Sequence, residues 1–244
     1  AYRGNAALPG AVTRVGDAYR GVGNHVKAGE VYNYVIENWP GDEFAMWSQM
    51  NLAMTKVRSG DPNADSATAK LLADYSDDSD APAAICWVAD EYRRYGKDDK
   101  ALKLYKKVLA DYPQANHALW SQMGLAISSL KLGNDPNAQD ALAYLLVDYG
   151  RQSGFGKGVL SIARQYYREK DFAKWRGVYQ TVLEVLDSLP KEKKGLWIGV
   201  ANVSGQRADV AKLVSCKSDA TPFRLKLSGG IPGEDKKREG AFRG

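Results

Sequence analysis

An internal repeat constrains the fold of this chain more than any other feature. Residues 84–133 align with residues 11–60 at a constant shift of 73, without a gap, and about 19 of the 50 positions are identical. The run Trp47-Ser48-Gln49-Met50 returns as Trp120-Ser121-Gln122-Met123. A period of this length is typical of solenoids and other arrays in which each unit stacks on the next.

Composition excludes several classes of protein. Of the 244 residues, 44% are apolar and 26% are charged, which is ordinary for a soluble globular chain. The net charge of +5 is spread along the chain, so we expect no nucleic-acid partner. No run of about 18 apolar residues occurs, so we expect no membrane span. Cys86 and Cys216 form no CxxC motif, and we expect no cofactor, metal site or disulfide framework.

The compartment stays open at this level. The chain begins at Ala1 rather than Met. We expect either a processed chain, exported or held in a bacterial internal or periplasmic compartment, or a trimmed one.

Hydrophobic periodicity predicts helices in both copies. Apolar residues of the first copy recur at helical spacing in two stripes, Val12, Val15, Gly16 and Tyr19, then Ala28, Val31, Tyr32, Val35 and Ile36. Pro40 ends the second helix, and Asp42 is a good N-cap for the third. Asp61 before Pro62 predicts the start of a fourth helix, and Asn134-Asp135-Pro136 repeats that signal.

A third, more diverged copy follows a glycine-rich joint. Val159, Ala163 and Tyr166 match Ile85, Ala89 and Tyr92 at a shift of 74. We therefore expect a lead-in at residues 1–10 and a repeat array at residues 11–205, with copies at about 11–80, 84–150 and 157–204. A tail follows at residues 206–244, and we expect a short helix over 205–214.

The first hairpin of each copy resembles a tetratricopeptide repeat (TPR). The pattern is a large, a small and an aromatic residue on the first helix, then Ala, an aromatic residue and a further apolar residue on the second helix, and Pro after its end. In one copy these residues are Ile85, Ala89, Tyr92, Ala101, Tyr105, Val108 and Pro113. In the other copy they are Val12, Gly16, Tyr19, Ala28, Tyr32, Val35 and Pro40. The resemblance implies an all-α, TPR-like α-solenoid of about five to six helix hairpins, a right-handed superhelix with an irregular C-terminal tail. The first helix of each hairpin would line a concave groove.

The resemblance also predicts which side chains face the groove. They include Thr13, Asp17, Arg20, Ser48, Cys86, Asp90, Arg93, Ser121, Arg164 and Tyr167. Asp17 and Asp90 stand where TPR domains that hold a peptide carboxylate have Asn, which argues against such a clamp. Two interpretations of the Asp-Arg pairs stay open: partner contacts, or i, i+3 ion pairs on a solvated face. Our partner-binding candidates are Asp17, Arg20, Trp87, Asp90, Arg93, Arg164, Tyr167, Arg224 and Lys226.

The remaining aromatic residues and both histidines are expected to be structural. We place Trp47, Trp120 and Trp197 in the core, Trp39 and Trp175 at the surface, and His25 and His117 in solvated turns. Cys86 is expected to be a structural thiol.

Three functions remain open. The leading hypothesis is a non-catalytic scaffold that assembles other protein subunits, with possible self-association into a filamentous or tubular enzyme complex. The alternative is a monomeric peptide-binding or envelope-assembly TPR adaptor. An enzyme on a TPR-like scaffold is the third, and no catalytic constellation supports it.

Overall fold

The computed structural model describes residues 5–149, 155–172, 174–175, 178, 212–213 and 225–226. These residues form two compact units, residues 1–121 and 122–244, with the boundary inside one helix. In chain order the helices are α1 (Leu8–Gly21), α2 (His25–Asn38), α3 (Glu43–Ser59), α4 (Ala64–Asp74), α5 (Ala81–Arg94), α6 (Asp98–Asp111), α7 (Asn116–Lys131), α8 (Asp135–Asp148) and α9 (Phe155–Arg168).

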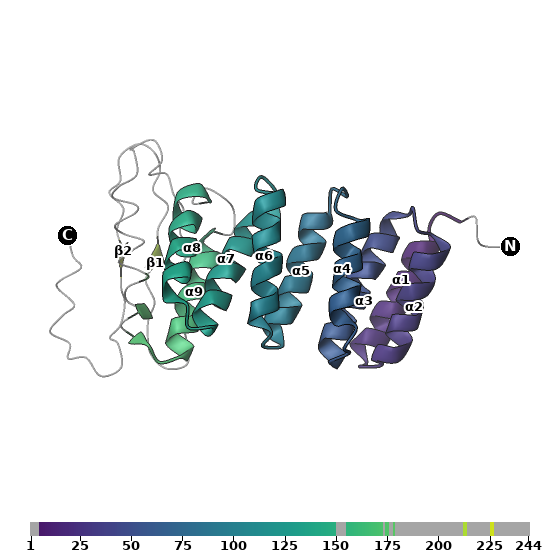
Figure 1. The fold of residues 1–244 in the computed structure, drawn as a ribbon, viewed down its shortest axis with the longest axis horizontal. Helices are drawn as coiled ribbons and strands as arrows, with labels where there is room; N and C mark the ends of the chain where they lie inside the picture. Colours follow the sequence, from purple (N-terminus) through teal and green to yellow (C-terminus); the bar gives the residue numbers. More distant parts are fainter. Residues whose placement is uncertain are drawn as a thin grey trace. The chain divides into compact units, whose positions relative to one another are not determined.

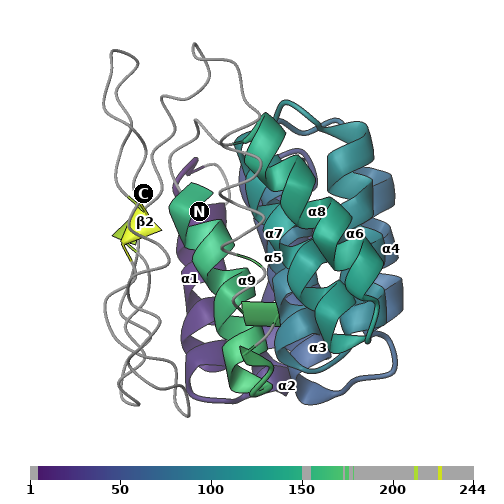
Figure 2. The same cartoon turned by 90° about the vertical axis from the view of Figure 1, so that its left-hand side faces the viewer.

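The repeat seen in the sequence is also a repeat of helices. Helices α5 and α6 begin and end 73 residues after α1 and α2, respectively. The first two helices of both copies therefore begin and end at equivalent residues. Consecutive helices pack as the hairpins α1–α2, α3–α4 and α5–α6. The first helices also contact each other, α1 against α3 and α3 against α5. Figures 1 and 2 show α4 and α6 side by side, with α3 and α5 forming a second layer against them.

Turn chemistry explains why the hairpins form. Gly23 and Gly96 lie at the same point of the repeat and adopt positive φ angles of 79° and 72°, a conformation that glycine takes without steric cost. The Asp42 carboxylate accepts a hydrogen bond from the backbone N–H of Phe44 at 3.0 Å, which confirms the predicted N-cap of α3.

The positions of the TPR pattern that lie on the second helix of each hairpin belong to the core of the first unit. Ala28, Tyr32 and Val35 on α2 are buried, as are their equivalents on α6, Ala101, Tyr105 and Val108. Gly16 lets α1 and α2 approach closely, because a Cβ atom there would lie 2.5 Å from Cε1 of Tyr32.

The second unit repeats this packing. Helix α8 contacts α9, and Val159, Ala163 and Tyr166 on α9 are buried. Gln122 donates a hydrogen bond to the carbonyl of Ala141 at 3.0 Å. In the first copy, Gln49 donates to the carbonyl of Ala67 at 2.7 Å. The same side chain therefore joins the third and fourth helices of each copy.

Some predicted boundaries are wrong. Helix α1 begins at Leu8, inside the expected lead-in, because proline fits the first turn of a helix and Pro9 lies there. Helix α4 begins only at Ala64, since the Asp61 carboxylate accepts from the backbone N–H of Asn63 and so stabilises a turn before the helix. In the second copy the N-cap is Asn134, whose side chain accepts from the backbone N–H of Asn137.

The C-terminal region contains a short antiparallel ladder. Strand β1 (Lys212–Leu213) pairs with β2 (Leu225–Lys226), with Lys212 opposite Lys226. At Lys212 and Leu213 this differs from the helix that we expected over 205–214, because their backbone groups pair with another strand. The other residues of that segment, and most of the predicted tail, lie outside the described residues.

Candidate protein-binding groove

Helices α1, α3 and α5 border a groove of about 360 Å³. We call it the α1–α3–α5 groove. It is lined by Gly10, Thr13, Arg14, Asp17, Arg20, Phe44, Trp47, Met50, Asn51, Met54 and Trp87. Three of the predicted site residues, Asp17, Arg20 and Trp87, meet here although they come from two copies of the repeat.

Aromatic rings form one wall of this groove. Trp87 is 43% exposed, and its ring centroid lies 5.5 Å from that of Trp47, at an interplanar angle of 35°. The ring of His117 meets Trp87 edge-on at 6.2 Å. Burial lowers the pKa of His117 below its usual value, so the neutral form is favoured.

Two of our expectations for these rings are wrong. Trp47 and His117 are each half-buried, whereas we had placed one in the core and the other in solvent. Trp47 lines the groove and His117 packs edge-on against Trp87, so each ring is covered only in part. The structure confirms that Trp87 reaches the groove.

A polar network lies beside the aromatic wall. The carboxylate of Asp17 accepts hydrogen bonds from the Tyr32 hydroxyl at 2.7 Å and from Asn51 Nδ2 at 3.2 Å. Arg20 Nη2 lies 3.3 Å from the same carboxylate, and Arg20 Nη1 donates to Asn51 Oδ1 at 2.7 Å. The predicted ion pair of Asp17 and Arg20 therefore exists, but it also joins α1 to α2 and α3.

The second copy repeats the centre of this network. Asp90 lies 2.9 Å from Arg93 Nη2, and it accepts a hydrogen bond from the hydroxyl of Tyr105 at 2.6 Å. Arg93 Nε donates to the same hydroxyl at 3.1 Å. Burial raises the pKa of Tyr32 and of Tyr105 well above the usual value for tyrosine, so both phenols stay protonated and donate.

Sequence analysis missed the tyrosines as members of the site. The signal was present, since both copies separate Asp from Tyr by 15 residues, Asp17 to Tyr32 and Asp90 to Tyr105. We had named these tyrosines only as positions of the TPR pattern. Their rings are buried in the core, while each hydroxyl reaches the network.

Four predicted groove residues are buried between helices, and of these four only Thr13 also lines the α1–α3–α5 groove. Thr13 and Ser48 share a hydrogen bond of 3.0 Å between their hydroxyls, where α1 meets α3. Cys86 and Ser121 are also buried. Burial raises the pKa of the Cys86 thiol to about 12, so the thiol stays protonated at neutral pH.

The other candidates do not join the groove. Arg164 is exposed on α9, and Tyr167 is half-buried, with ring contacts to Phe172 at 5.5 Å and Trp175 at 6.2 Å. Trp175 is buried, so our expectation of an exposed ring is wrong, because it packs on this aromatic cluster. Lys226 belongs to β2, and Arg224 lies outside the described residues.

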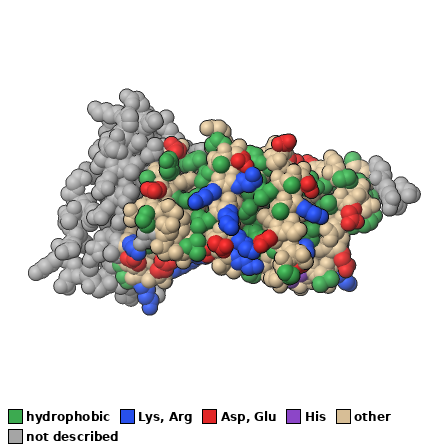
Figure 3. Space-filling view, in the orientation of Figure 1, with side chains coloured by type: hydrophobic (Ala, Val, Ile, Leu, Met, Phe, Trp, Pro, Cys, Tyr) green, Lys and Arg blue, Asp and Glu red, His purple; other side chains and the backbone are tan. Residues whose placement is uncertain are grey.

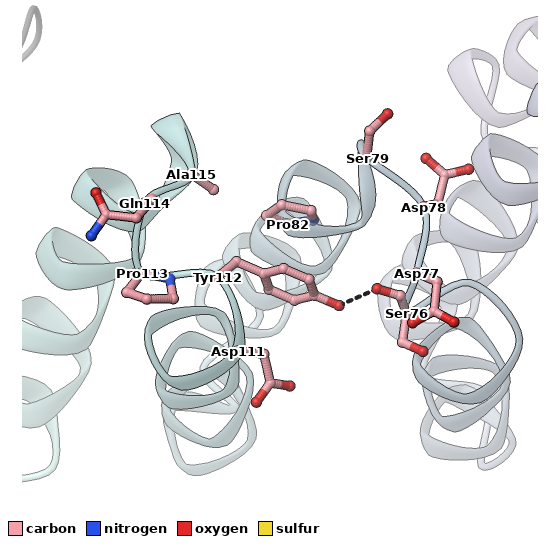
Figure 4. A pocket seen from close by; sticks show the side chains of 10 residues that line it. All are labelled: Ser76, Asp77, Asp78, Ser79, Pro82, Asp111, Tyr112, Pro113, Gln114 and Ala115. Atoms are coloured by element: carbon pink, nitrogen blue, oxygen red, sulfur yellow. Dashed lines mark hydrogen bonds between the residues drawn. The ribbon is translucent and has the colours of Figure 1, made fainter.

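A second cleft, of about 610 Å³, lies between the α4–α5 and α6–α7 loops (Figure 4). Its walls include Asp77, Asp78 and Asp111. The hydroxyl of Tyr112 donates to the carbonyl of Ser76 at 2.6 Å and ties the two loops together.

The described part of the chain has neither a metal-binding cluster nor a membrane-spanning helix. No group of three or more His, Cys, Asp and Glu side chains there is arranged to hold a metal ion. No helix among the described residues is long and apolar enough to cross a membrane. On the face seen in Figure 3, positive and negative side chains are intermixed and form no field of a single sign.

Comparison with known proteins identifies the fold. The family model for the tetratricopeptide repeat matches residues 89–115. No curated protein matches the chain by sequence. Nearly identical TPR-like repeats of a Podosopora anserina protein superpose with a TM-score of 0.52 at 16% identity, over 75% of this chain and 96% of that chain. A variant of the same protein gives 0.53 at 16% identity, over 74% and 95%.

A further structure is less similar. It is that of pilF from Pseudomonas aeruginosa, with a TM-score of 0.47 at 18% identity, over 76% of this chain and 78% of that chain. At these identities the likeness concerns the fold alone. The chain has the fold of a TPR-like α-solenoid, and its residues 89–115 match the tetratricopeptide repeat by sequence.

Proposed function

We propose that this chain is a non-catalytic scaffold that organises other protein subunits into a complex, and that the α1–α3–α5 groove binds one of them. Solenoids present extended surfaces that bind proteins. The observation that carries the proposal is the exposed Trp87 ring beside Trp47 in this groove. Tryptophan, tyrosine and arginine dominate the binding energy of protein interfaces, and the groove supplies tryptophan and arginine.

The lining of the groove suggests how a partner segment binds. The aromatic wall of the groove also contains Phe44 and two methionines. Together these side chains form an apolar surface suited to one large apolar side chain of an extended segment. Arg20 and Asn51, fixed by Asp17, place polar groups beside it. Because the ion pair already compensates the charge of Arg20, the groove favours apolar recognition over capture of a terminal carboxylate.

The proposal extends to larger assemblies on the basis of sequence resemblance. The Asp-Pro-Asn-Ala turns and Leu-Leu-x-Asp-Tyr helix ends resemble those of bacterial multi-repeat TPR proteins, one of which organises nitrite oxidoreductase into tubules. Head-to-tail contacts between repeat proteins that do not close produce filaments. We include a filamentous or tubular assembly in the proposal for this reason, with residues 215–244 as a contributor.

Light scattering tests the proposal. We expect the purified chain to enter a larger complex when mixed with native extract, and expect Trp87→Ala to reduce that shift. Trp39→Ala is the matched control, because Trp39 is a half-buried tryptophan outside the groove. Removal of residues 215–244 should weaken assembly while the helical circular dichroism signal stays intact. Equal assembly by the Trp87→Ala variant would refute the role of the groove.

The alternative is a monomeric peptide-binding or envelope-assembly adaptor, which the same groove also favours. In that case the chain stays monomeric at every concentration and binds one partner segment at 1:1 stoichiometry. Self-association of the purified chain distinguishes the scaffold from the adaptor.

A further inference from the structure

The outward face of α1 is an exposed apolar stripe. Ala11, Val15, Ala18 and Val22 follow one another at spacings of four, three and four residues, so they lie on one side of the helix. All four are exposed, with Val15 at 50% and Val22 at 80%. We call these four residues the α1 stripe.

The same face is covered in the later copies. Ala84, Val88 and Glu91 on α5 are the equivalents of Ala11, Val15 and Ala18, and all three are buried where α5 packs on α3 and α4. Tyr95, the equivalent of the C-cap residue Val22, stays 43% exposed, so the covered part of this face ends at Glu91. On α9 the equivalent Ile162 is buried as well. The repeat therefore builds this helix face to be covered by a preceding hairpin.

A polar pair marks the same surface. Lys100 lies over the ring of Tyr92 at 5.7 Å, and both side chains bind Asp65 of α4, the lysine at 2.6 Å and the hydroxyl at 2.7 Å. The bond from Lys100 lowers the pKa of Asp65. In the first copy, Lys27 lies over the ring of Tyr19 at 5.5 Å.

The first copy thus holds the lysine and the tyrosine in place without the acid. Among the described residues, no carboxylate forms an ion pair with Lys27, and the hydroxyl of Tyr19 forms no hydrogen bond. Whatever covers the α1 stripe should bring the missing carboxylate.

We propose that the α1 stripe, with Tyr19 and Lys27, is a docking surface for the terminal helix hairpin of another repeat array. The hairpin is of the α3–α4 kind and carries a carboxylate at the position of Asp65. Repeat equivalence identifies this occupant, since α3–α4 covers the same face of α5. Charge complementarity supports it, because Lys27 lacks the acid that Lys100 has. This surface is separate from the groove, and the inference rests on the head-to-tail assembly in the proposed function, for which it names the contact surface.

A binding experiment with the full chain tests the proposal. The probe is a synthetic peptide of residues 42–80, which spans α3 and α4, and its affinity is measured by fluorescence anisotropy. We expect binding to the wild-type chain and a loss of about tenfold or more for Val15→Asp, which places a charge in the covered face. An Asp65→Asn probe should bind several-fold more weakly.

The matched control is Val26→Asp. Val26 is exposed near the same end, but its equivalent in the second copy is Asp99, which stays exposed when the hairpin is covered. This variant should bind the probe as the wild type does. Equal binding by Val15→Asp and Val26→Asp would overturn the proposal.

If the free peptide does not fold, a fused chain tests whether this hairpin docks on the α1 stripe. Residues 42–80 are joined directly ahead of Leu8, which is the equivalent of Ala81, so the added hairpin reaches α1 as α3–α4 reaches α5. We expect the midpoint of thermal unfolding to rise by about 4 °C or more, and expect Val15→Asp to cancel the gain. A fused hairpin that leaves the midpoint unchanged refutes the proposal.

Discussion

Removal of Arg58 should destabilise the first unit far more than removal of its partner, Glu91. Arg58 lies in the last turn of α3, and its Nε donates to Glu91 Oε1 on α5 at 2.8 Å. The Glu91 side chain is only 1% exposed, whereas that of Arg58 is 27% exposed. Arg94 lies 3.4 Å from the other carboxylate oxygen, but it is 66% exposed. The pair joins the first copy to the second.

The asymmetry of exposure sets the expected magnitudes. Arg58→Met leaves a buried carboxylate with one solvated partner, and loss of a partner from a buried pair costs about 3–5 kcal/mol. Because Arg58 is partly exposed, we expect the lower part of that range, about 3–4 kcal/mol. Glu91→Met leaves an arginine that reaches water, at a cost of about 1 kcal/mol or less. The double variant should resemble Glu91→Met, since two apolar side chains replace the pair.

Urea unfolding followed by circular dichroism measures these free energies, and thermal unfolding gives an independent measure at about 2–4 °C per kcal/mol. Arg94→Met is the matched control and should change the free energy of unfolding by about 0.5 kcal/mol or less. The reasoning is refuted if the double variant is as unstable as Arg58→Met, because that result would mean that Arg58 acts through its own packing rather than through the charge of Glu91.

Three further predictions concern side chains of the first unit. Gly16→Ala should cost about 1–3 kcal/mol in thermal unfolding because the new Cβ meets Tyr32 at 2.5 Å. The control Gly29→Ala, where the nearest atom is 3.6 Å away, should be neutral or stabilising. Cys86 should react with iodoacetamide at pH 8 only after unfolding, as read by peptide mass spectrometry, because burial raises the pKa of its thiol to about 12; labelling of the folded chain would contradict this. Burial also raises the pKa of Tyr92 to about 12, so its contribution to stability is complete below about pH 10 and is lost as the pH rises towards 12. Tyr92→Phe should flatten that alkaline loss in a series of urea titrations, and an unchanged pH profile would argue against it.

Much of the fold follows from the sequence, because the same pattern of apolar residues and turns occurs in two copies and predicts the same helices in each. Ala28, Tyr32 and Tyr105 are positions of the TPR pattern in the sequence, and all three are buried in the structure. The first residues of the helices were less predictable, because a carboxylate such as that of Asp61 can accept hydrogen bonds in two different local structures. It can cap a helix or stabilise the turn before one, and in this chain it does the latter.

The candidate site was only partly predictable. The sequence paired Asp17 with Arg20 through their spacing on one helix, since such neighbours meet by geometry alone. It did not show that the hydroxyl of Tyr32 and the amide of Asn51 complete the network, because those contacts join residues on three helices.

The sequence by itself determined that the chain is an array of helix hairpins, since a repeated apolar pattern can be buried only by stacking. Only the tertiary structure decided which faces the stacking covers. Val15 and Val88 are the same residue at equivalent positions, and one is exposed while the other is buried. The physical reason is that burial depends on the neighbouring hairpin, which α5 has in α3–α4 and α1 lacks among the described residues.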